Sequence, residues 1–232
     1  MDSSSFLAFP FEHLPFVFIV MVLAFTFHEF AHAYTAYRFG DPTPDQMGRV
    51  TLNPKAHLDI FGTLLLLIAG FGWAKPVLVN RSRFKFPRLM GVVVSFAGPF
   101  SNLLMAFIGT FLVYLFTQFG WFSGANEGIS DALHVFFGYL ISLNLILFLF
   151  NMIPLPPLDG YRIVADLAPL DLRMRLARFE QWGMYIFLLL VFIPPLSRMT
   201  IGPLFGLSRP IFAAFQIWLN QVFGPIVNWS KF

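Results

Sequence analysis

The chain has 232 residues, of which 57% are hydrophobic and only 12% are charged. Soluble domains are on average about 45–50% apolar and about 25% charged, so the composition excludes an ordinary soluble domain and indicates a protein surrounded largely by lipid. The net charge is only +3, and the basic residues are dispersed among apolar segments, which argues for orientation in a membrane rather than nucleic-acid binding. The chain has no cysteine, so disulfides and thiolate metal ligands are excluded.

The N-terminal segment Met1 to Glu12 contains no lysine or arginine and lacks the charged region of a signal peptide. We therefore expect a retained helix to carry the chain into the membrane. The apolar stretch that follows, at about 16–37, has the roughly 20 residues that a membrane-spanning helix needs.

This first predicted span contains the segment His28-Glu29-Phe30-Ala31-His32. Histidines four residues apart lie on one face of a helix, so both imidazoles can reach the same metal ion, and neutral imidazole suits zinc. Glu29 can serve as general base for the attacking water and then pass the proton to the leaving amine. Ionisable groups within a span are costly and mark functional sites. If Arg38 lies near the membrane surface, the two histidines lie roughly 9–15 Å below it, at about 1.5 Å per residue.

The next apolar stretch, at about 61–72, is too short to cross a bilayer as a helix. Gly62 and Gly72 bracket it and Lys75-Pro76 follow, so the pattern predicts a short strand or a re-entrant β-hairpin. Such a backbone survives at membrane depth only if it is buried in protein or lines a wet cavity. We expect an unwound substrate peptide to pair with a strand edge within residues 62–79.

Four further apolar stretches follow, at about 90–117, 132–153, 180–196 and 207–223. With the first span they predict an all-α polytopic membrane protein with about five transmembrane helices and the short β-hairpin element near the active site. We expect one membrane-embedded domain over residues 1–232, with its core at about 16–165 and C-terminal helices at about 180–223. If the stretch at 61–72 does not cross, 13 of the 15 basic residues, Lys231 among them, share one side, which the positive-inside rule assigns to the cytoplasm.

A third ligand is needed, because catalytic zinc usually takes three protein ligands. The candidate side chains are Asp41, Asp45, His57, Asp59, His134, Asp159 and Asp166. Asp159 is the best placed, because the prolines at 154, 156 and 157 end a helix and Gly160 allows a close backbone approach just after the acid. From the residues alone, an ordinary loop aspartate is an equal alternative.

Together, the histidine motif and the segment Asn151-Met152-Ile153-Pro154-Leu155-Pro156-Pro157-Leu158-Asp159-Gly160 resemble the site-2 protease family of intramembrane zinc metalloproteases, in its short bacterial form. Further segments that resemble this form are Asp41–Thr43, Gly48–Pro54, Phe71–Val77 and Ala97–Asn102. The resemblance covers about residues 20–165 and leaves no room for a PDZ or CBS module. It implies one zinc ion per chain, held by His28, His32 and Asp159. It also implies that Glu29 activates water and that Asn151 lies close to the reacting carbonyl.

The expected function is hydrolysis of a peptide bond in or near a transmembrane segment of a membrane protein substrate. The expected surroundings are the lipid bilayer of a bacterial inner membrane, with an active site that opens to the cytoplasm and no nucleic-acid partner. A zinc transporter or sensor is the alternative, and it would not need Glu29 as a base. A non-catalytic membrane adaptor is a second alternative.

Other polar residues receive plainer interpretations. We expect His57 to be solvated or structural, and His13 and His134 to lie at the membrane interface. Asn144 and Ser142 are expected to form hydrogen bonds between helices. Gly98, Ser101 and Asn102 are expected to serve helix packing, with one polar contact. Asn151 has its own alternative, an amide that satisfies free carbonyls at a helix end.

Overall fold

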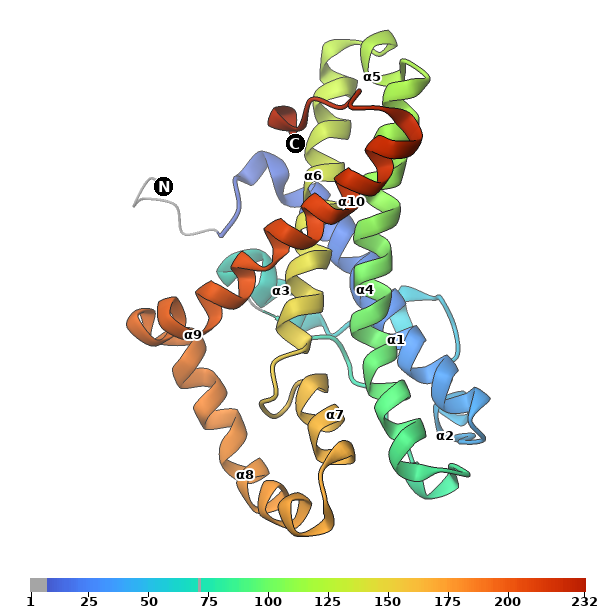
Figure 1. The fold of residues 1–232 in the computed structure, drawn as a ribbon, viewed down its shortest axis with the longest axis vertical. Coiled ribbons are helices and arrows are strands. Elements are labelled where there is room, and N and C mark those ends of the chain that lie inside the picture. The colour runs from blue at the N-terminus through green and yellow to red at the C-terminus, as the bar shows by residue number, and fades with distance from the viewer. Residues whose placement is uncertain (1–7, 71) are drawn as a thin grey trace.

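A computed structural model describes residues 8–70 and 72–232 (Figure 1). Phe71, which belongs to one of the motifs quoted above, and residues 1–7 of the N-terminal segment without lysine or arginine lie outside the described residues. Nearly all regular structure in the described part is helical. Its α-helices are α1 (Leu14–Arg38), α2 (Thr43–Gln46), α3 (Ile60–Ala69), α4 (Pro87–Gln118), α5 (Trp121–Gly124), α6 (Glu127–Asn151), α7 (Asp159–Leu167), α8 (Leu170–Phe192), α9 (Pro194–Gly206) and α10 (Ser208–Phe223).

Helix α4 is the centre of the fold and packs against α1, α6 and α7. Val20 of α1, Ala106 and Val113 of α4 and Leu145 of α6 share one buried cluster. The opposite face of α4 carries an exposed apolar row at helical spacing: Val93, Phe96, Phe100, Leu104 and Ile108. A helix that is apolar on both its packed face and its open face suits a lipid environment.

Three helical segments in the described part are long and apolar enough to cross a membrane: Phe11–Arg38, Pro87–Gln118 and Glu127–Asn151. They match the first, third and fourth of the six predicted apolar stretches. The predicted spans at 180–196 and 207–223 form instead a bent arrangement, in which α8 meets the segment Pro194–Phe223 at 93°. The described residues therefore hold three such spans, or four if the bent pair is one span, and the expected five are not found.

The position of the C-terminus shows that one basic residue, Lys231, was predicted on the wrong side. Phe232 contacts the rings of Phe122 and His134, so the chain ends beside α5. In Figure 1 this end of the bundle lies far from the start of α4. Lys231 thus does not join the basic residues that precede α4, because α8, α9 and α10 together make one net passage along the bundle where two were expected.

The stretch predicted as a strand or hairpin is the helix α3. The Asp59 side chain caps it by accepting a hydrogen bond from the Gly62 N–H at 2.8 Å, and Gly70 ends it with φ of 71°. These local end signals favour a helix over a strand. The chain then turns back, and an isolated antiparallel bridge pairs Leu58 with Ala74. A re-entrant turn therefore exists, but the expected β-hairpin is not found among the described residues.

Candidate metal centre

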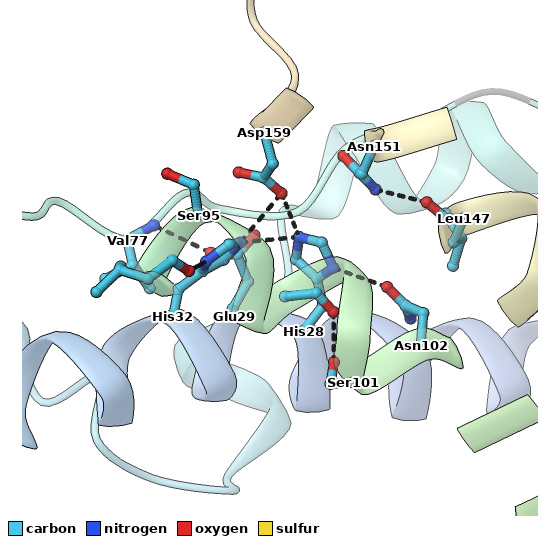
Figure 2. A network of polar contacts seen from close by, with 12 residues as sticks. His28, Glu29, His32, Val77, Ser95, Ser101, Asn102, Leu147, Asn151 and Asp159 are labelled. Carbon is cyan, nitrogen blue, oxygen red and sulfur yellow. Dashed lines mark hydrogen bonds and ion pairs between the residues drawn. The ribbon is translucent and has the colours of Figure 1, made fainter. Parts of the chain in front are cut away.

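Three candidate ligand side chains, from two helices far apart in the sequence, meet in the interior (Figure 2). His28 and His32 lie one turn apart on α1, and their Nε2 atoms are 3.1 Å apart. Asp159 begins α7, and its Oδ2 atom lies 3.2 Å from each Nε2. All three side chains are buried. In the part of the chain that the structure describes, no other group of three histidine, aspartate or glutamate side chains converges in this way.

The approach of α7 to α1 depends on both ends of this short helix. At its start, a Cβ on Gly160 would lie 2.4 Å from the Met152 carbonyl oxygen, so only glycine allows the chain to pass there. At its end, Arg81 donates to Asp166 at 2.8 Å, and Arg88 donates to the Asp166 carbonyl at 3.0 Å. The close approach predicted at Gly160 is confirmed, and it positions the Asp159 carboxylate.

The outer nitrogen of each histidine is also satisfied. His28 Nδ1 lies 2.7 Å from Asn102 Oδ1, and His32 Nδ1 lies 2.7 Å from the Val94 carbonyl oxygen. Both partners are acceptors, so each Nδ1 carries the proton and each Nε2 keeps a lone pair directed at the other ligands. Hydrogen bonds of this kind fix the orientation of metal-binding imidazoles.

Asn102 therefore has a role that the sequence analysis missed. It orients His28 and also donates to Asn144 Oδ1 at 2.9 Å, which confirms the expected interhelical bond of Asn144. Ser142 instead bonds the Gly138 carbonyl within α6. The available signal was spacing, because Asn102 follows Gly98 by four residues and so shares its face of α4.

Gly98 itself lies directly against the ligands. A Cβ built on Gly98 would lie 2.2 Å from His32 Nε2 and 2.7 Å from His28 Nε2. Contacts below 3.0 Å require something to move, and both rings are held at Nδ1. The expectation of close helix packing at Gly98 is confirmed, but what packs there is the pair of imidazoles.

These residues fit a zinc ion. Ligands about 2.0–2.1 Å from a tetrahedral zinc lie about 3.3–3.4 Å from one another, close to the separations of 3.1–3.2 Å here. Two neutral imidazole nitrogens and one carboxylate oxygen are also a donor set that catalytic zinc takes, with one position left for water or substrate.

Glu29 lies beside the ligands and is buried as well. Its Oε2 atom accepts a hydrogen bond from the Val77 N–H at 3.0 Å, and its Oε1 atom makes no hydrogen bond among the described residues. One oxygen is thus anchored by the extended segment after α3, while the other is free to accept a proton.

A cavity of about 1020 Å³ joins the three ligands, Glu29 and Asn151. In this structure the Asn151 amide donates to the Leu147 carbonyl at 3.0 Å, as the plainer interpretation of that residue expected. The same side chain lines the cavity, so it is close to the space that a substrate would fill.

The other ligand candidates lie elsewhere. Asp41 accepts from the backbone of Thr43 and Asn80, Asp59 caps α3, and Asp166 pairs with Arg81. His57 is fully buried, with Nε2 2.7 Å from the Thr51 carbonyl, so the solvated alternative is wrong. His134 stacks on Phe122 near α5.

Comparisons with known proteins agree with this geometry. The model of peptidase family M50 matches residues 16–194. A Bacillus subtilis protein named "Putative zinc metalloprotease YwhC" is 51% identical over 204 residues, which cover 88% of this chain and 92% of that protein. A Mycolicibacterium smegmatis protein named "Putative zinc metalloprotease Rip2" is 29% identical over 195 residues, covering 78% of this chain and 70% of that protein. No solved structure matches the chain.

Proposed function

The chain belongs to peptidase family M50 and is a zinc metalloprotease of the membrane, and we propose that it hydrolyses a peptide bond in or near a transmembrane segment of a membrane protein. The observation that carries this proposal is the buried group of His28, His32 and Asp159 with Glu29 beside it. Three apolar helices surround or adjoin that group, which supports a substrate drawn from the membrane.

In the proposed mechanism, His28, His32 and Asp159 hold the zinc ion and Glu29 moves the proton. Zinc in such a site acts as a Lewis acid that polarises a carbonyl and lowers the pKa of water towards neutrality. The Oε1 atom of Glu29 takes the proton of the attacking water and then delivers it to the leaving amine. Asn151 gives up its bond to the Leu147 carbonyl and donates its amide to the reacting carbonyl oxygen.

The proposed substrate lies along the extended segment after α3. Pro76, Val77, Leu78 and Val79 line the same cavity as the ligands. A helical peptide hides its scissile bond, whereas an unwound peptide that pairs with an extended segment exposes it. The Val77 N–H already binds Glu29, so the pairing would use the backbone of the residues around it.

The proposed orientation places the cavity mouth towards the cytoplasm of a bacterial inner membrane. The ion pair of Arg81 and Asp166 holds the basic segment before α4 and the basic residues of α7 and α8 at one end of the bundle. The loop at 118–131, at the other end, has no basic residue. This asymmetry supports a cytoplasmic cavity under the positive-inside rule, within one membrane-embedded domain over residues 1–232.

Cleavage of a single-span substrate in proteoliposomes tests this function. We expect mass spectrometry to map the cut within the membrane segment or beside it, chelation to abolish cleavage, and added Zn²⁺ to restore it. A cut in a distant soluble tail would contradict the proposal. Zinc flux across the same vesicles without cleavage would favour the transporter alternative.

A further inference from the structure

The cavity around the candidate metal ligands has two chemically different ends, and their order can be followed along the axis of α4. A Cβ on Gly98 would lie against both histidines, whereas a Cβ on Gly91 would lie 3.3 Å from Arg81 Nε. Gly91 precedes Gly98 by seven residues, or about 10 Å along a helix. The arginine end of the cavity is therefore nearer the start of α4 than the metal ligands are.

The deeper end of the cavity is apolar. Its lining residues there come from α1, α6 and α8 and are Phe25, Leu147, Phe150, Phe187 and Leu188. Such a lining suits the side chains of a transmembrane segment. The metal ligands lie between this apolar end and the arginines, so a substrate that spans the cavity meets them where its apolar segment gives way to its polar flank.

The outer end of the cavity is charged. Its lining includes Arg81, Arg162, Arg173 and Glu180. Arg81 is already paired with the buried Asp166 at 2.8 Å, and Arg173 lies 3.9 Å from the same carboxylate. Arg162 makes no hydrogen bond or ion pair within residues 8–70 and 72–232. Even with Asp166 and Glu180 counted, the three arginines leave an excess of positive charge.

We propose that Arg162 and Arg173 form a subsite for an acidic side chain on the polar flank of the substrate, next to the scissile bond. The inference rests on the proposed function, because it describes how the same cavity selects its substrate. Guanidinium groups bind carboxylates through paired, charge-assisted hydrogen bonds. Arg81 keeps its pairing with Asp166 and holds α7 in place, while Arg162 and Arg173 have the capacity for a new partner.

The position of the subsite gives it a second effect. An acidic residue held by Arg162 and Arg173 fixes how far the substrate enters the cavity, and this sets which peptide bond lies beside the ligands. A substrate with a neutral flank lacks this anchor. The subsite therefore favours membrane segments that are followed by aspartate or glutamate over segments followed by glutamine or lysine.

A panel of single-span substrates that differ only in the flank tests the subsite. The first residues after the membrane segment are varied in turn among glutamate, glutamine and lysine, and kcat/KM is measured in uncharged vesicles. We expect glutamate at the best position to exceed glutamine by about tenfold, the order of a charge-assisted hydrogen bond that is partly solvated. In the double variant Arg162→Gln/Arg173→Gln this ratio should fall to near one.

Matched variants separate the subsite from general charge. Arg175 and Arg178 are exposed on the same helix as Arg173 but do not line the cavity, so Arg175→Gln/Arg178→Gln should keep the preference for glutamate. The reversed pair Arg162→Glu/Arg173→Glu should instead prefer a lysine flank. An equal rate for glutamate and glutamine in the wild-type protein would overturn the inference, as would a preference that survives in Arg162→Gln/Arg173→Gln.

A binding measurement keeps this test independent of the chemistry. Zinc-loaded Glu29→Gln protein is titrated with the same substrates, and the affinity ratio of glutamate to glutamine flanks is compared with and without the two arginines. A ratio that depends on the arginines supports the subsite even if no substrate is cleaved, in which case only the proposed function fails. A binding ratio near one in uncharged vesicles, together with arginine-dependent binding of vesicles that contain phosphatidylglycerol, would assign the arginines to lipid and overturn the inference.

Discussion

Asp159→Ala is expected to empty the metal site and abolish cleavage together. In the proposed site its Oδ2 atom is the carboxylate ligand, and it lies 3.2 Å from both imidazole nitrogens. Outer groups that only orient a ligand already contribute about 10–100-fold to metal affinity, so loss of a direct ligand should exceed that. The zinc content of the purified variant, measured by mass spectrometry of the metal, checks this expectation.

The matched control for this prediction is Asp171→Ala. Asp171 lies at the start of α8, is exposed, and lies outside the ligand group. This control should retain both zinc and cleavage. If Asp159→Ala bound zinc as tightly as the wild-type protein, another side chain would have to be the third ligand.

Gly98→Ala is expected to remove zinc while it leaves the helices intact. The added methyl group would lie 2.2 Å from His32 Nε2, and the ring cannot move away without breaking its bond to the Val94 carbonyl. Alanine is also a better helix former than glycine by about 1 kcal/mol, so α4 itself should not suffer. We expect zinc content and cleavage to be lost while circular dichroism shows unchanged helix content.

Gly109→Ala separates this effect from general crowding of α4. The three atoms nearest to a Cβ at Gly109 are side-chain atoms of Ile141 and Leu140, the nearest at 3.2 Å, and these can adjust. The control should therefore keep zinc even if its thermal stability changes. Wild-type zinc content in Gly98→Ala would mean that the ion is not bound by Nε2 of both histidines.

The pairing of His28 with His32 was predictable from the sequence because it is local to one helix. The spacing of His28 and His32 follows from helix periodicity alone. Spacing alone could not assign Asp159 to the site, because it lies far from α1 in the sequence. The resemblance to a known family supplied that assignment. The structure brings it within 3.2 Å of both histidines.

The supporting contacts were not predictable in the same way. Asn102 and the Val94 carbonyl orient the histidines, and the Val77 N–H anchors Glu29. Each of these contacts joins segments that lie 48 to 74 positions apart in the chain. Their pairing depends on how α1, α4 and the extended segment pack, which hydropathy does not encode.

The membrane spans show where hydropathy reasoning works and where it fails. It located α1, α4 and α6, because each is one long uninterrupted apolar helix. It overcounted after residue 180, where prolines at 194 and 195 divide the apolar sequence and the chain bends by 93°. Hydropathy reasoning also predicted a strand or hairpin where the helix α3 forms. The apolar run is too short to span a membrane, but its capping residues Asp59 and Gly70 favour a helix.

The most direct test of the central claim measures zinc content and cleavage on the same purified samples of wild-type protein and Glu29→Gln. Glu29 lies beside the ligand group but is not one of its members, so the variant should keep about one zinc ion per chain. Its cleavage of a single-span substrate should fall by about 10²–10⁴-fold, the usual contribution of a general base. Equal cleavage by both proteins would contradict the role of Glu29, and zinc bound by both with no cleavage by either would contradict the protease mechanism at this site.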